Sequence, residues 1–152
     1  MTNQISINDI KKLREKTGAP ILEIKKALEE NKGNFDKTLI SLQKWAKEQA
    51  AKKKSEATSQ GLVEAYIHAG GKVGSLIILS CQTDFVARTG EFKQLAHELA
   101  MQVASMNPKD VDKLLKQTYI RDPKKTIRAL IDEAIAKMGE NIEVKKIIRF
   151  SI

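Results

Sequence analysis

The segment Cys81–Arg88 combines residue types that suit contact with a partner molecule. An apolar run, Leu76–Leu79, predicts a strand directly before it, and the acidic and aromatic side chains of Asp84 and Phe85 follow side by side. Two interpretations of Phe85 are open. Apolar residues beside strands are usually buried, so the ring could pack on the protein's own core at a strand–helix corner. Alternatively, the strand ends by presenting Asp84 and Phe85 for insertion into another molecule.

The chain contains no constellation typical of an enzyme or a metal site. His68 and His97 have no cysteine or paired carboxylate at ligand spacing. The Gly-x-Ser-x-Gly and His-Glu-x-x-His patterns are absent, and Gly70–Lys72 lacks the wider spacing of a phosphate-binding loop. Glu91 and Glu98 are interpreted as a solvated helix face. We therefore expect a binding protein that is not an enzyme and that uses no cofactor or metal.

The charge balance favours an anionic partner. Lys and Arg total 27 against 19 Asp and Glu, which gives a net charge of +8. This indicates either a nucleic acid or an acidic protein surface, unless the charge serves only solubility. The basic residues are mostly scattered lysines, with one run at Lys52–Lys54, and no arginine cluster alternates with aromatic residues as in single-strand binders. A nucleic-acid partner is therefore the less favoured of the two.

The distribution of apolar and cysteine residues predicts a cytoplasmic protein without a membrane segment. Cys81 is the only cysteine, so no disulfide can form within the chain, and its place at a strand end suggests a small buried residue. The N-terminus Met1–Gln4 is polar, unlike a secretory signal. No stretch reaches the roughly 18 apolar residues that a membrane-spanning helix requires.

The first 45 residues predict a bundle of three helices. Ser6 is suited to cap the first helix, Gly18 ends it, and Pro20 fits the start of the second. The expected inward stripe of the second helix is Ile21, Ile24 and Leu28. Residues 46–60 lack apolar periodicity but are rich in helix-forming residues, so they predict a helical connector.

Residues 61–152 predict an α+β domain with a three-stranded antiparallel sheet packed with helices. Residues 62–68 and 73–80 read as strands joined by a hairpin at Gly70-Gly71. Asp122-Pro123 is predicted to start a helix that Gly139 closes, with Asp122 as its cap. Along the last strand, one face is expected to hold Ile142, Val144, Ile148, Phe150 and Ile152, with Lys146 as an interruption.

Three segments of the chain resemble the signatures of elongation factor Ts. They are Leu13–Ala19 with Lys25–Leu28, then Cys81–Arg88, and finally Met138–Ile142 before the last strand. Together they span nearly the whole sequence in the order that the family shows. The resemblance implies that the first 45 residues are similar to a ubiquitin-associated (UBA) domain, in agreement with the predicted helices.

The resemblance also implies a partner and a mechanism. The partner would be elongation factor Tu, in its GDP-bound or nucleotide-free state, and the chain would act as its guanine nucleotide exchange factor in translation elongation. Asp84 and Phe85, flanked by Thr83 and Val86, would enter the partner beside its magnesium and phosphate site. In the bundle, the implied docking residues are Arg14, Ile21 and Leu22, of which Leu22 is the better contact candidate because Ile21 is expected to face inward.

The chain departs from the family pattern in length, since it contains one core unit where many members have two. We therefore expect that two copies pair as a homodimer, with the connector or an unpaired sheet edge as the interface. Two other functions are weighed against the exchange factor: a basic nucleic-acid-binding protein, and an adaptor that uses only the UBA-like bundle. The adaptor would leave residues 61–152 unexplained.

Overall fold

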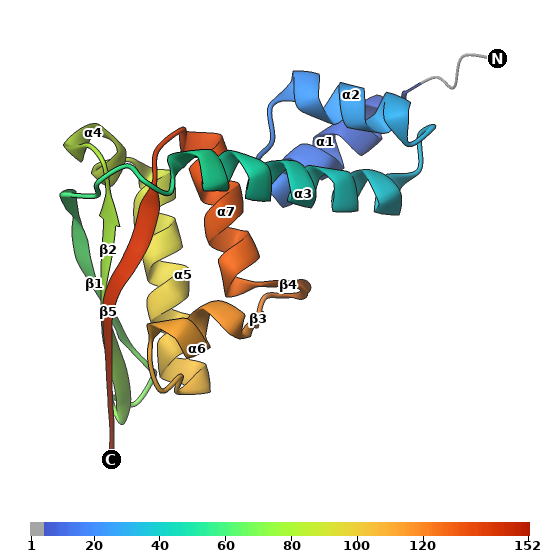
Figure 1. Cartoon of the computed structure of the whole chain (residues 1–152). Coiled ribbons are helices and arrows are strands. Elements are labelled where there is room, and N and C mark those ends of the chain that lie inside the picture. Colours follow the sequence, from blue (N-terminus) through green and yellow to red (C-terminus); the bar gives the residue numbers. More distant parts are fainter. Residues whose placement is uncertain (1–4) are drawn as a thin grey trace.

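The computed structural model describes residues 5–152 and confirms the α+β class (Figure 1). The polar N-terminus that argued against a secretory signal, residues 1–4, lies outside the described residues. The first three helices of the chain are α1 (Ile7–Thr17), α2 (Ile21–Glu30) and α3 (Phe35–Lys53). The predicted caps are present, since Ser6 Oγ accepts the Asp9 amide at the start of α1 and Gly18 ends the helix with a φ of 67°.

The three helices enclose a small aliphatic core, and α3 extends beyond it. The buried residues of this core are Leu13, Ala19, Ile24, Ala27, Leu28 and Leu42. Ile21 is not among them: its side chain is 41% exposed, so the expected inward position is wrong for this residue. Ile21 is the first residue of α2, and the buried stripe of this helix begins one turn later, with Ile24, Ala27 and Leu28. The C-terminal half of α3 packs on α7 (Ile127–Met138), and its Ala50 belongs to the larger core.

The larger core lies under one face of an antiparallel sheet. The strands are β1 (Gln60–Ile67), β2 (Val73–Cys81) and β5 (Ile142–Ser151), with β2 in the centre. The hairpin at Gly70-Gly71 is confirmed, because β1 and β2 pair antiparallel on either side of it. The helix α5 (Gly90–Met106) covers the inner face together with α7 (Figure 1). Fully buried side chains here include Ile77, Leu79, Phe92, Leu99, Ile127, Ile131 and Ile142.

The last strand does not keep one apolar face, which corrects the sequence-based expectation. Ile78 pairs with Lys146 while the next residue, Leu79, pairs with Val144, so Lys145 is an extra residue in a β-bulge. One extra residue reverses the side on which every later side chain lies. Ile142 and Val144 therefore face the core, whereas Ile148 and Phe150 lie on the outer face and are exposed.

The predicted helix start at Asp122 is also wrong. Asp122–Thr126 forms strand β4, which pairs with β3 (Thr118–Tyr119) as a small separate sheet. The helix α7 begins only at Ile127, because Thr126 is the better cap: its Oγ1 accepts the Ala129 amide at 3.1 Å. Pro123 is compatible with the short β4, where it has no ladder partner to satisfy. The short helix α6 (Val111–Lys116) precedes this hairpin.

Candidate functional site

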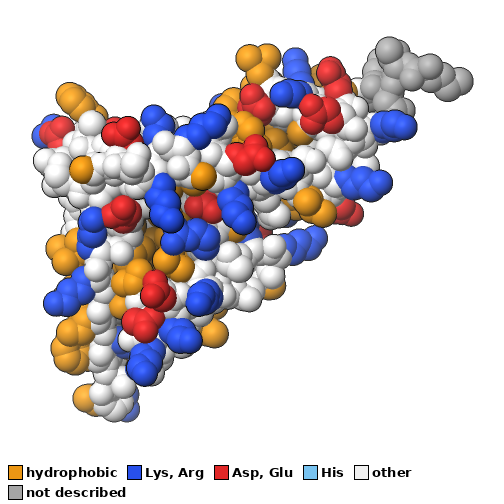
Figure 2. All heavy atoms as spheres, in the orientation of Figure 1, with side chains coloured by type: hydrophobic (Ala, Val, Ile, Leu, Met, Phe, Trp, Pro, Cys, Tyr) orange, Lys and Arg blue, Asp and Glu red, His pale blue; other side chains and the backbone are white. Residues whose placement is uncertain are grey.

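Phe85 lies on the surface and not in the core. It is the second residue of the single-turn helix α4 (Asp84–Ala87), and its side chain is 79% exposed. The interpretation in which the ring packs on the protein's own core is therefore wrong. Figure 2 shows hydrophobic atoms projecting from the end of the molecule where α4 lies.

Asp84 lies beside Phe85 but does not cap the helix. The cap is Thr83, whose Oγ1 accepts the Val86 amide. The Asp84 carboxylate is about half exposed and accepts a hydrogen bond from Arg88 at 2.7 Å, one turn later. Val86 is half-buried and packs against the larger core, so it anchors the turn from below. The turn thus offers one carboxylate and one aromatic ring to solvent.

A carboxylate from another part of the chain fixes this turn. Glu140 follows α7, and its two oxygens accept hydrogen bonds from the amide and the hydroxyl of Thr83, at 3.0 and 2.6 Å. Next to Glu140, the backbone amide of Asn141 donates a hydrogen bond to Gln82 Oε1 at 2.6 Å. Hydrogen bonds to an ionised group are the stronger kind, so the α4 turn is held by charge-assisted contacts on its buried side. The sequence segments Cys81–Arg88 and Met138–Ile142 therefore form one structural unit.

Cys81 is buried beneath the same turn and donates a hydrogen bond to the Thr83 carbonyl oxygen. Burial raises the pKa of the Cys81 thiol, and the nearby Glu140 carboxylate raises it further. The thiol is therefore neutral at physiological pH, which fits a packing role for this cysteine, as the sequence suggested.

The predicted bundle residues form a second, separate surface. Leu22 is 80% exposed in the first turn of α2, its neighbour Ile21 is 41% exposed, and Arg14 is exposed in the last turn of α1. The bundle packs on the N-terminal half of α3, whereas α4 lies near the C-terminal end of α3 (Figure 1). The structure therefore brings Thr83, Asp84, Phe85 and Val86 together on α4 but does not place the bundle residues with them.

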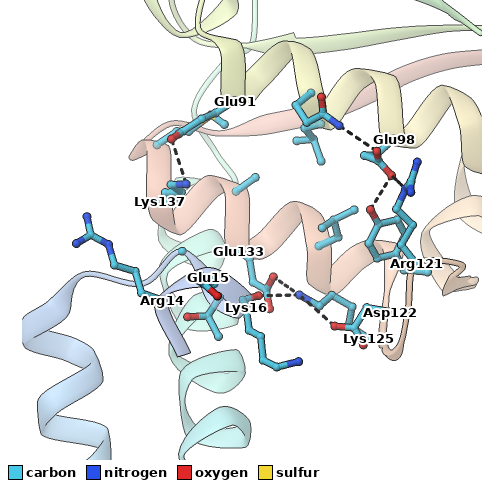
Figure 3. Close-up of a pocket in the computed structure, with 18 of the residues that line it drawn as sticks. Arg14, Glu15, Lys16, Glu91, Glu98, Arg121, Asp122, Lys125, Glu133 and Lys137 are labelled. Atoms are coloured by element: carbon cyan, nitrogen blue, oxygen red, sulfur yellow. Dashed lines mark hydrogen bonds and ion pairs between the residues drawn. The ribbon is translucent and has the colours of Figure 1, made fainter. Parts of the chain in front are cut away.

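A cleft of about 890 Å³ separates the bundle from the core (Figure 3). Its walls come from the end of α1, from α5, from the β3–β4 hairpin and from α7. Charged residues on these walls pair with one another, as Glu91 does with Lys137 at 3.1 Å. None of the predicted α4 residues lines this cleft.

Glu98, predicted to lie on a solvated helix face, is instead buried in this wall. Its carboxylate accepts hydrogen bonds from the Tyr119 hydroxyl at 2.8 Å and from Arg121 Nε at 2.6 Å. Burial, with the neighbouring Glu98 carboxylate, raises the pKa of Tyr119 far above its usual value, so the phenol stays protonated as a donor. Both partners come from the β3–β4 hairpin, just before the helix start expected at Asp122, and the sequence did not predict this hairpin, which is why the pairing was missed.

Among residues 5–152, no three His, Cys, Asp or Glu side chains gather in a way that could hold a metal ion. Within the same range no helix combines the length and apolarity needed to span a membrane.

Comparison with known proteins identifies close sequence relatives. Residues 82–152 match the family model described as Elongation factor TS. Proteins named Elongation factor Ts from Thermotoga maritima and Thermoanaerobacter sp. (strain X514) are 40% and 37% identical, over 98% and 96% of this chain and over 96% and 94% of their own lengths. The protein of that name from Methylacidiphilum infernorum is 38% identical over 100% of this chain and 97% of its own length.

The alignments also show a difference in length. The alignment with the Thermoanaerobacter protein spans 191 positions, more than the 152 residues of this chain. The relative therefore contains segments that have no counterpart here.

Proposed function

Because this chain belongs to the elongation factor Ts family and so has a role in translation elongation, we propose that it is a guanine nucleotide exchange factor for elongation factor Tu. The observation that carries this proposal is the outward position of Phe85, on a turn held by Glu140. An exposed aromatic ring on a rigid support suits insertion into a partner's pocket, since little conformational entropy is lost on binding.

The proposed mechanism is a linkage between two binding events. Burying one phenylalanine side chain in a partner pocket contributes roughly 1.5–3 kcal/mol. If this pocket forms only when the GTPase has loosened its contacts to magnesium and phosphate, the factor stabilises that loosened state. Linkage then requires that the factor weaken GDP binding as much as GDP weakens binding of the factor. Asp84 supplies a carboxylate next to the ring for a polar contact at the same place.

In this proposal the two surfaces have different tasks. Residues 1–45 dock on the nucleotide-binding domain of the GTPase through Arg14, Ile21 and Leu22, and residues 61–152 carry the exchange turn. Residues 46–60 connect the two. Exposure of Leu22 and Ile21 at the start of α2 supports this assignment. The factor acts by binding alone, without a covalent step or a cofactor of its own.

We further propose that two copies pair through the outer face of the sheet. This face carries Val63 and Ile67 of β1, Leu76 and Ile78 of β2, and Ile148 and Phe150 of β5, all exposed. Pairing aligns Val63 with Ile78 and Leu76 with Ile148, so the apolar surface is continuous across the three strands. Since longer members of the family have a second core unit, a second copy of this chain is the occupant that would replace it.

The experiment that tests the function is release of a fluorescent GDP from elongation factor Tu in a stopped-flow instrument. We expect the purified chain to accelerate release in a concentration-dependent, saturable manner. The competing function, suggested by the +8 charge, is a nucleic-acid-binding protein. That protein would leave GDP release unchanged and would bind RNA or DNA with an affinity that falls steeply as salt increases.

A further inference from the structure

One buried lysine joins the bundle to the core. Lys125 is at the end of β4, and its side chain is only 7% exposed. Its ammonium group donates to Glu133 Oε2 on α7 at 2.7 Å and to the backbone carbonyl of Lys16 in α1 at 3.1 Å. Asp122 lies 3.9 Å away. Figure 3 shows Lys125 between Glu133 of α7 and Lys16 at the end of α1.

The carbonyl of Lys16 is a suitable partner for a cation. It lies in the last turn of α1, where backbone carbonyls have no partner within the helix and carry the negative end of the helix dipole. The adjacent loop is also tightly packed, because a Cβ at Gly18 would lie 2.8 Å from Cδ of Lys137 on α7. The end of α1 therefore contacts the core through a specific polar bond and close packing.

Glu133 depends on the same lysine. The carboxylate is 8% exposed, and its second oxygen, Oε1, has no hydrogen-bond partner among the residues that the structure describes. Burial raises the pKa of Glu133, while the hydrogen bond from Lys125 opposes that rise. Lys125 thus compensates an otherwise isolated buried carboxylate and still reaches the bundle.

Two helices of the bundle, α3 and α1, contact the core. One connection is α3, whose C-terminal half packs on α7. The other is the bond from Lys125 to α1. A bundle held only by α3 could tilt about that helix, whereas a second attachment point fixes its orientation.

We propose that Lys125 is a positioning residue that fixes the bundle against the core and thereby sets the separation between the Leu22 and Phe85 surfaces. Its kinetic consequence rests on the proposed exchange function, in which both surfaces contact one GTPase. Two surfaces held at a fixed separation bind with a high effective concentration, which is lost when one of them moves freely.

The test uses a double variant, because removing Lys125 alone would leave Glu133 buried and unpaired, which is strongly destabilising. In Lys125→Met/Glu133→Leu both charges are replaced by apolar groups, a change that is often neutral for stability. The variant keeps the core but cannot bond to the Lys16 carbonyl. Lys124→Met, the exposed neighbour, is the matched control.

The first readout needs no partner protein. Spin labels are attached at Glu29→Cys on α2 and Lys113→Cys on α6, in a Cys81→Ser background. Pulsed electron paramagnetic resonance then measures the distance between the bundle and the core. We expect a narrow distribution for the parent and for Lys124→Met, and a clearly broader one for the double variant. Equal widths in all three proteins would overturn the proposal.

The second readout is GDP release from elongation factor Tu. We expect the half-saturating concentration of the double variant to rise about tenfold, with the rate at saturation unchanged, because positioning affects effective concentration and not the turn itself. A broadened distance with an unchanged half-saturating concentration would overturn the positioning role. If the parent chain itself fails to release GDP, the exchange function fails, and the distance measurement still decides whether Lys125 fixes the bundle.

Discussion

Glu140 is the residue that determines how Asp84 and Phe85 are presented. Neither Asp84 nor Phe85 is held by packing on the core, since the Phe85 side chain is 79% exposed and the Asp84 side chain is about half exposed. Two hydrogen bonds from Thr83 to the Glu140 carboxylate hold the turn, together with the packing of Val86 on the core. The resemblance pointed to Asp84 and Phe85, but a partner 57 positions away in the sequence leaves no local signal.

Glu140→Gln should weaken the hydrogen bonds that hold the α4 turn without removing all of them. A glutamine carbonyl can accept one of the two hydrogen bonds from Thr83, but its amide nitrogen cannot accept the other. Hydrogen bonds to charged groups are worth about 1.5–3 kcal/mol, so we expect a loss of about 1–2 kcal/mol in the free energy of unfolding. Urea denaturation measures this change, and Glu48→Gln, exposed on α3, is the control. Equal urea midpoints for Glu140→Gln and the parent would contradict the role of this carboxylate.

Asp132→Asn should stabilise the protein at neutral pH. Burial raises the pKa of Asp132, although the nearby positive charges of Arg128 and Lys47 oppose this. A carboxyl whose pKa is higher in the folded state favours folding at low pH, and this contribution is lost as the pH rises through the folded pKa. Asparagine does not ionise and avoids that loss. We therefore expect a higher urea midpoint than the parent at pH 7, and a smaller difference near pH 3.5. A lower midpoint at pH 7 would show that the attraction to Arg128 and Lys47 dominates.

Among the elements, α7 links both functional features, since Glu133 lies within it and Glu140 follows its end. Its start is therefore important for the site. Thr126→Ala removes the side-chain acceptor for the Ala129 amide, and loss of such a cap costs about 1 kcal/mol. We expect a destabilisation of this size by urea denaturation and recovery of most of it in Thr126→Ser. No loss in Thr126→Ala would mean that the β3–β4 hairpin alone sets the start of α7.

Sequence patterns predicted those elements whose signals are local. The caps at Ser6 and Gly18, the Gly70-Gly71 hairpin and the three-helix bundle all depend on residues a few positions apart, and all are present. The prediction for the start of α7 was wrong because two local signals competed, Asp122-Pro123 and Thr126. Pairing of β4 with β3 favoured the start after Thr126.

The bulge at Lys145 was not predictable for a different reason. Apolar residues lie on both faces of β5, so alternation does not indicate where an extra residue is inserted. Only pairing with β2 determines that Ile148 and Phe150 face outward. Long-range partners such as Lys125 and the Lys16 carbonyl are likewise a product of the whole fold, since 109 positions separate them.

At the scale of the whole molecule, the outer sheet face predicts the oligomeric state. An exposed apolar patch that is continuous across three strands usually marks an interface. We expect sedimentation at micromolar concentration to give a dimer for the parent and a monomer for Phe150→Lys, since the new charge would be buried in the interface. Ile40→Lys, a similar change at an exposed position on α3, should remain dimeric. A monomeric parent would contradict the proposed pairing.

The most direct test of the central claim compares Phe85→Ala with Ile40→Ala in the stopped-flow release of fluorescent GDP from elongation factor Tu. Because Phe85 is 79% exposed, its replacement should leave the fold and the melting temperature unchanged. Burial of the Phe85 side chain in the partner is worth roughly 1.5–3 kcal/mol, so the account predicts that Phe85→Ala lowers the exchange rate about 10-fold or more. Ile40→Ala should behave as the parent. A rate at saturating Phe85→Ala equal to that of the parent would contradict the account.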